Sequence, residues 1–110
     1  MTDQLIETAN LETVLADFAR RRNWERFHSP KNLTMALTGE VGELAEIFQW
    51  MTEEESRQVM NSSETAAAAE DELADVMIYI VRLASVLGVD LNRAVTSKLA
   101  KNELRFPPLT

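Results

Sequence analysis

The 110-residue sequence contains no cysteine, three glycines, three prolines and one histidine. The lack of cysteine excludes disulfides, thiolate catalysis and thiolate metal ligands. A bound metal ion would therefore need oxygen ligands or His28. Few glycines and prolines among many Ala, Leu, Glu and Met residues favour helices over strands. No apolar run approaches the roughly 20 residues that a bilayer-spanning helix needs.

Basic residues are also few, since 11 Lys and Arg stand against 18 Asp and Glu, for a formal net charge of −7. An acidic surface repels phosphodiester backbones, so nucleic acid is not expected as a partner. An anionic substrate would need a metal ion or a local basic cluster to overcome this field. Residues 1–10 lack the basic and apolar regions of a secretion signal, so we expect a cytoplasmic protein with no membrane partner.

Hydrophobic periodicity predicts a single all-α domain over residues 1–110, a helical bundle of four to five helices. Residues 1–9 are polar and are expected to be frayed. The predicted helices cover about 11–22, 30–51, 52–60, 64–87 and 90–104.

Local signals mark several helix ends. Ser29 followed by Pro30 is typical of a helix start. Thr52 and Glu55 form a possible capping box. Gly88 is expected to stop the long helix.

The second half of the long helix, 76–87, is apolar on almost every side. A helix of this kind must be covered all round. In so small a domain this predicts another subunit, so we expect the bundle to be completed by oligomerisation.

Two pairs of carboxylates lie three residues apart, Glu40 with Glu43 and Glu72 with Asp75. Residues at this spacing project from one helix face, so two neighbouring helices could surround a cavity with four acids. Such acids repel one another unless a cation lies between them. Mg²⁺ prefers carboxylate oxygens and keeps water positions open for chemistry. The plain alternative is that each acid faces solvent, but the pairing beside apolar residues favours a metal site.

Gly39 and Gly42 leave the surface around the first acid pair bare. Two glycines within a helix cost roughly 1 kcal/mol each relative to Ala. We expect a partner helix or a ligand to approach closely there.

The helix face that carries each acid pair continues to an aromatic residue. Tyr79 lies one turn beyond Asp75, and Trp50 lies two turns beyond Glu43. Two turns of helix rise about 10 Å, roughly the reach from a triphosphate to a base. Aromatic faces stack on nucleobases, and Trp24 and His28 in the preceding loop could complete the pocket. Taken singly, however, these aromatic residues are more typical of a core, and a lone histidine is more often structural.

The last predicted helix carries Lys98, Asn102 and Arg105 on one face, with Lys101 beside them. Such a stripe could hold phosphates. From spacing alone, an ordinary solvated face is the simpler interpretation.

Taken together, these residues resemble a known family. The acid pattern resembles the metal-binding signature of MazG-like all-α nucleoside triphosphate pyrophosphohydrolases, and the resemblance is closest to the dCTP pyrophosphatase branch. It covers nearly the whole chain. The segments that carry it are Glu40-x-x-Glu43, Glu72-x-x-Asp75, Trp24-x-x-Phe27-His28, Pro30-Lys31-Asn32-Leu33 and Lys98-x-x-x-Asn102-x-x-Arg105-Phe106-Pro107.

The resemblance implies hydrolysis of a (deoxy)pyrimidine triphosphate, dCTP or a 5-substituted dCTP, to the monophosphate and pyrophosphate, with a role in cleansing the nucleotide pool. It implies a homo-oligomer, dimer or tetramer, with sites at subunit junctions. The roles it implies are Mg²⁺ binding and catalysis by Glu40, Glu43, Glu72 and Asp75, base contacts by Trp24, His28, Trp50 and Tyr79, and phosphate contacts by Lys98, Asn102 and Arg105.

One departure bears on base preference rather than on reaction type. Some dCTP-cleaving relatives carry a histidine on the first helix where this chain has Leu15. The alternatives are a related pyrophosphohydrolase acting on dUTP or broadly on damaged nucleotides, and a non-catalytic helical oligomeric adaptor. In the adaptor the acids would be structural and the aromatic residues would form the core.

Overall fold

The computed structural model describes residues 4–110, and these residues form helices without any strand. The prediction of an all-α fold with four to five helices is therefore confirmed. The elements are α1 (Ala9–Arg21), η1 (Glu25–Phe27), α2 (Pro30–Phe48), α3 (Glu53–Arg57), η2 (Val59–Asn61), α4 (Ser63–Leu87) and α5 (Leu91–Arg105), where η denotes a 3₁₀ helix.

The predicted helix-end signals are present in the structure. The Ser29 hydroxyl accepts a hydrogen bond from the Asn32 amide at 3.1 Å and caps α2. Thr52 and Glu55 form a reciprocal capping box at α3. Gly88 ends α4 in the left-handed conformation, with φ of 73°. Short-range chemistry therefore marks the starts of α2 and α3 and the end of α4.

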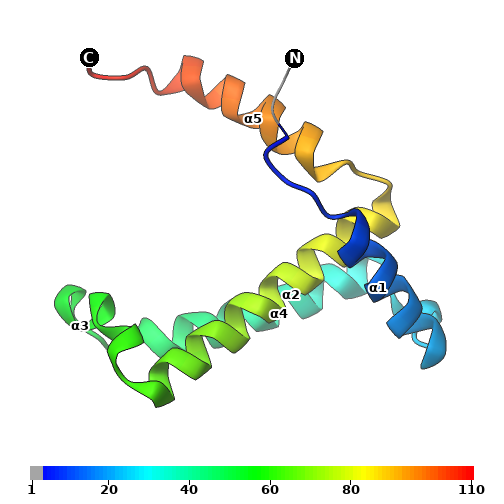
Figure 1. Ribbon diagram of the computed structural model, residues 1–110, viewed down its shortest axis with the longest axis horizontal. Helices are drawn as coiled ribbons and strands as arrows, with labels where there is room; N and C mark the ends of the chain where they lie inside the picture. Colours follow the sequence, from blue (N-terminus) through cyan, green and yellow to red (C-terminus); the bar gives the residue numbers. More distant parts are fainter. Residues whose placement is uncertain (1–3) are drawn as a thin grey trace.

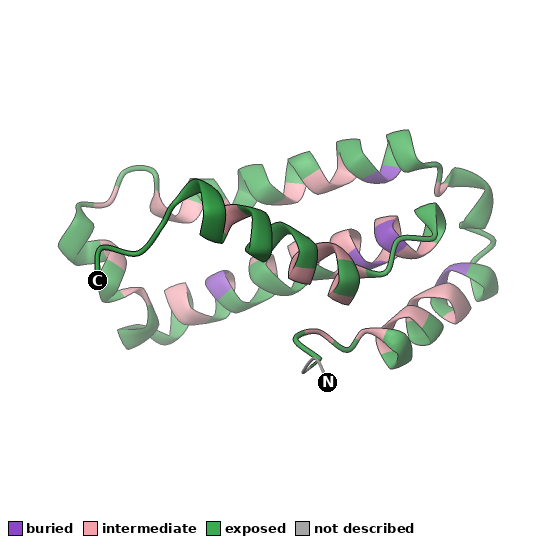
Figure 2. Cartoon of the chain, turned by 90° about the horizontal axis from the view of Figure 1, so that it is seen from above, coloured by how far each residue is buried: buried purple, intermediate pink, exposed green. Residues whose placement is uncertain are grey.

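The packing of α2 along α4 organises the molecule (Figure 1). The two helices run in opposite directions, so the start of α2 lies beside the end of α4. There α1 packs against α4 as well. Figure 2 shows that the few buried positions lie on these three helices. Those side chains are Ala19, Leu33, Ala69, Val81 and Ala84.

Residues 4–110 form an open rather than a compact arrangement. The radius of gyration is 17.0 Å, whereas a compact domain of this length has about 13 Å. Helix α5 leaves the end of α4 and runs over the α2–α4 pair without joining the main helix contacts (Figures 1 and 2). Met77 and Leu87 on α4 remain about half exposed. No helix in the described part of the chain has the length and apolar character needed to cross a bilayer.

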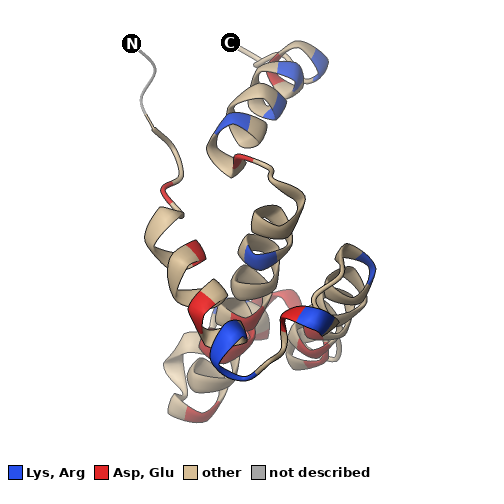
Figure 3. Ribbon diagram, turned by 90° about the vertical axis from the view of Figure 1, so that its right-hand side faces the viewer, with Lys and Arg blue, Asp and Glu red and all other residues tan. Residues whose placement is uncertain are grey.

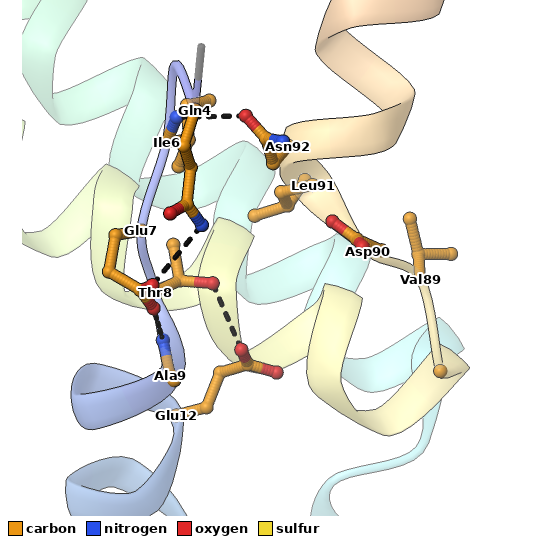
Figure 4. Close-up of a pocket in the computed structure, with 11 residues that line it drawn as sticks. Gln4, Ile6, Glu7, Thr8, Ala9, Glu12, Val89, Asp90, Leu91 and Asn92 are labelled. Carbon is orange, nitrogen blue, oxygen red and sulfur yellow. Dashed lines mark hydrogen bonds between the residues drawn. The ribbon is translucent and has the colours of Figure 1, made fainter. Parts of the chain in front are cut away.

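The segment before α1 lies against the start of α5. The Asn92 Oδ1 atom accepts hydrogen bonds from the amides of Leu5, at 2.8 Å, and Ile6, at 3.1 Å. A cavity of about 420 Å³ lies here, and no predicted site residue lines it (Figure 4). The predicted fraying of residues 1–9 falls partly on residues 1–3, which lie outside the described residues.

Leu33→Ala should destabilise the fold by about 2–5 kcal/mol, because it leaves a cavity where a side chain only 2% exposed now packs. Urea unfolding at one fixed protein concentration measures the change. Leu109→Ala is the matched control, since Leu109 is fully exposed, and should shift stability by less than about 0.5 kcal/mol. Equal losses in both variants would show that the α2–α4 contact is not the core.

Candidate functional site

Three of the four predicted metal ligands meet where the middle of α2 lies beside α4. Carboxylate oxygens of Glu40, Glu43 and Glu72 all lie within 4.8 Å of one another. Asp75 is not part of this group, but it is close enough for its charge to raise the pKa of both Glu40 and Glu72. The predicted convergence of two acid pairs is thus seen for three carboxylates, with the fourth beside them.

The acids are held together at an electrostatic cost. Burial, followed by the charge of Glu43, raises the pKa of Glu40 to about 7. Burial also raises the pKa of Glu72, again with a contribution from Glu43. The Oε2 atoms of Glu40 and Glu72 are buried and have no hydrogen-bond partner among residues 4–110. Buried acceptors without a donor are unfavourable, and a cation between them would remove both penalties.

The face of α2 around these acids is open. A Cβ atom placed on Gly39 or Gly42 would meet no atom of the described chain within 4 Å, apart from its immediate neighbours and the nearby backbone of α2 itself. The close approach expected at the glycines is therefore not made by the chain's own described residues. A shallow cavity of about 350 Å³ opens beside the acids, lined by Glu43, Glu46, Ile47, Ala68 and Glu72.

A second cavity, of about 250 Å³, lies between α1, η1 and the last turns of α4. It brings together three of the four predicted base contacts, Trp24, His28 and Tyr79. Tyr79 follows Glu72 by seven residues, a rise of about 10 Å along α4. The lining residues are Leu15, Phe18, Ala19, Trp24, His28, Ile78, Tyr79 and Arg82.

The pocket also contains a charged residue, Arg82, that was not among the predicted site residues. Arg82 donates a hydrogen bond from Nε to Nδ1 of His28 at 3.1 Å. Burial and then the Arg82 charge hold the pKa of His28 below its usual 6.5, while Glu25 acts in the opposite direction. Arg82 follows Tyr79 by three residues, so helical spacing alone could have placed it on the same stripe.

The structure places Trp50 away from this pocket. Helix α2 ends at Phe48 rather than at the predicted Met51, so Trp50 lies in the following turn and is 89% exposed. His28, in contrast, precedes the start of the helix. The 19 residues of α2 separate the two sites by about 28 Å along the helix axis. A single chain therefore does not bring Trp50 to the other aromatic residues.

The predicted phosphate contacts are likewise separated from the acids. Lys98 and Arg105 are exposed and Asn102 is half-buried on α5. Figure 3 shows the basic residues of α5 on a helix apart from the acid-bearing α2–α4 pair. Their assignment to the site stays a prediction.

Comparison with known proteins agrees with this arrangement. The sequence model of the MazG-like family matches residues 36–107. The chain belongs to the MazG-like family. The resemblance drawn from the acid pattern is therefore confirmed.

Two curated relatives are dCTP pyrophosphatase 1 of Homo sapiens, 52% identical, and of Rattus norvegicus, 51% identical. Each match extends over 92 residues, which are 84% of this chain and 54% of the relative. The chain thus spans about half the length of the curated relatives that it matches. Among solved structures, a pyrophosphatase from Archaeoglobus fulgidus is similar, with a TM-score of 0.85 and 34% identity. That match covers 98% of this chain and 99% of the other.

The acid cluster predicts a pH dependence of stability without metal. Because the folded-state pKa of Glu40, about 7, lies above the ordinary 4.5, its stabilising contribution is full below pH 4.5 and is lost as the pH rises through about 7. Glu40→Gln mimics the protonated acid. In EDTA, the variant should therefore gain stability relative to the wild type between pH 5 and pH 8, as measured by urea unfolding.

Glu70→Gln provides the control, since it removes an exposed carboxylate from α4. Its stability difference from the wild type should not vary with pH in this window. The same pH dependence in the two glutamine variants would contradict the assignment of the effect to the cluster.

Proposed function

We propose that this chain is a Mg²⁺-dependent nucleoside triphosphate pyrophosphohydrolase that converts a pyrimidine triphosphate, dCTP or a 5-substituted dCTP, to the monophosphate and pyrophosphate. The observation that carries the proposal is the group of three carboxylates within 4.8 Å of one another between α2 and α4. The names of the relatives, dCTP pyrophosphatase 1 and pyrophosphatase, support the same reaction. An enzyme of this kind would act on the nucleotide pool of the cytoplasm.

The residues of the cluster fit a hard divalent cation. All three residues offer carboxylate oxygens, and the Oε2 atoms of Glu40 and Glu72 are buried without a hydrogen-bond donor in the described chain. Glu40, Glu43 and Glu72 would hold Mg²⁺, with Asp75 beside them. When bound, Mg²⁺ would neutralise the triphosphate and polarise the bond to be cleaved.

The chain's own residues would position the substrate and accept a proton. A carboxylate of the cluster would take the proton from the attacking water. Glu43 is the exposed member of the group, so the cluster is accessible from solvent. Trp24, His28 and Tyr79 would surround the base about 10 Å away along α4. This separation allows one nucleotide to reach both the acids and the pocket.

We propose that the active form is a homo-oligomer whose sites combine two copies. The acids and the basic face of α5 lie apart within one chain (Figure 3). A second copy could supply Lys98, Asn102 and Arg105 to the phosphates, and Trp50 to the base. Pairing of this kind would also cover apolar residues such as Met77, which is 51% exposed.

Glu43→Gln should reduce pyrophosphate release from dCTP by at least about 100-fold, because it weakens the metal site and removes a candidate proton acceptor. It should also abolish the rise in melting temperature that Mg²⁺ produces in the wild type. A pyrophosphate-release assay over dCTP, 5-methyl-dCTP, dUTP and dTTP, with Mg²⁺ or EDTA, measures the effect. Glu70→Gln is the control and should stay within about twofold of the wild type.

Undiminished turnover in Glu43→Gln would contradict the cluster's role. No Mg²⁺-dependent melting shift, together with no hydrolysis of any triphosphate, would instead favour a helical adaptor.

Mixing Glu43→Gln with Lys98→Ala, each of which should be inactive alone if both residues serve the site, tests whether the site is shared between copies. If each site takes acids from one copy and α5 from the other, refolding Glu43→Gln with Lys98→Ala in equal amounts yields mixed dimers with one intact site. Mixed dimers form about half of the population, so about a quarter of wild-type activity should return.

The matched control mixes Glu43→Gln with Glu72→Gln, whose lesions lie in the same half of the site, and should recover nothing. Absence of recovery in the first mixture, when native mass spectrometry detects mixed dimers, would show that the site does not combine two copies in this way.

A further inference from the structure

His28 and Arg82 form one polar wall of the aromatic cavity. His28 follows η1, whereas Arg82 lies on α4, and the contact between them joins residues 54 positions apart in the sequence. Both line the cavity together with mainly apolar side chains such as Leu15 and Ile78. Apart from the Trp24 indole N–H and the Tyr79 hydroxyl, the polar side-chain groups of this cavity lie on this wall, so they would take part in the recognition of a polar ligand there.

The contact between these residues sets the state of the imidazole. A guanidinium group offers only N–H donors, so Nδ1 of His28 must accept the hydrogen bond from Nε of Arg82. The neutral ring then carries its proton on Nε2. Burial and the positive charge of Arg82 both favour the neutral ring by lowering the pKa of His28, against the single acidic neighbour that acts on it, Glu25.

We infer that Arg82 is a positioning residue of the base pocket, which holds the His28 proton on Nε2 so that this wall presents only N–H donors to a cytosine-type base. Cytosine offers two adjacent acceptors, O2 and N3. Uracil instead carries an N–H donor at N3 between its carbonyls. This N–H group would face an N–H donor of the wall, and the two could not form a hydrogen bond. This inference rests on the proposed function, because it assumes that the cavity takes the base of the substrate.

The chain offers a direct spectroscopic test, since His28 is its only histidine. The ¹⁵N shifts of the ring nitrogens report the tautomer, and their titration reports the pKa. The wild type should show the Nε2–H tautomer and a pKa below 6.5. Arg82→Met should mix the tautomers and raise the pKa towards 6.5, whereas Arg82→Lys should keep the lowered pKa because it retains the charge.

Two further variants complete the set. Arg93→Met removes an exposed arginine of α5 and should leave the ring signals unchanged. If Arg82→Met fails to fold, Arg82→Gln replaces it, with the same expected rise in pKa because it also lacks the charge. Ring signals of the neutral variant identical to those of the wild type would overturn the inference, as would Lys and Met variants that behave alike.

Specificity is measured as the ratio of kcat/KM for dCTP to that for dUTP. In Arg82→Met, His28 loses the hydrogen bond from the charged guanidinium and is no longer held with its proton on Nε2. The ratio should therefore fall by about tenfold or more. Arg93→Met should keep the wild-type ratio. A ratio that stays constant while the ring signals change would overturn the assignment of specificity to this wall. If the wild type hydrolyses no triphosphate, the proposed function fails, and the ring measurements still decide the role of Arg82 in holding His28.

Discussion

The antiparallel packing of α2 against α4 is the interaction on which both candidate sites depend. Because α2 begins where α4 ends, the loop before α2 meets the last turns of α4, and the middles of the two helices meet each other (Figure 1). The first contact forms the aromatic pocket and the second forms the acid cluster. Leu33 and Val81, both almost fully buried, stabilise this pairing. Their apolar packing must offset the repulsion among three neighbouring carboxylates.

Within the described part of one copy, the acid cluster lacks basic partners and several apolar side chains stay exposed. Within residues 4–110, no ion pair joins the acids of the α2–α4 pair to the basic face of α5, which lies on a separate helix (Figure 3). Apolar side chains such as Leu73, 58% exposed, and Leu99, 52% exposed, lie on these same helices. A second copy would satisfy both requirements, because packing on the exposed apolar side chains would also bring its basic helix α5 close to the acids. The open shape, with a radius of gyration of 17.0 Å, leaves room for such a partner.

Features that depend on neighbouring residues could be predicted from the sequence, and features that depend on tertiary contacts could not. The caps at Ser29 and Thr52 and the stop at Gly88 are local, and they lie where the pattern placed them. A spacing of three residues places each acid pair on one face of its helix, and the packing of α2 on α4 then brings Glu40, Glu43 and Glu72 together. The placement of Trp50 on the same helix face as Glu43 assumed a helix through Met51, whereas α2 ends at Phe48, so the role of Trp50 stays a prediction.

The contact between Arg82 and His28 is the clearest example of a feature that the sequence could not predict. On sequence, Arg82 only interrupts an apolar helix, and its partner His28 lies 54 positions away. In the folded chain, α4 carries Glu72, Tyr79 and Arg82 in the order that the proposed nucleotide substrate would need, from phosphate to base. Leu15 contributes only apolar surface to this pocket, and apolar contacts discriminate poorly between similar ligands. If the cavity takes the base, as proposed, discrimination between bases would come from hydrogen bonds, and the His28–Arg82 pair would supply these beside the Trp24 indole N–H and the Tyr79 hydroxyl.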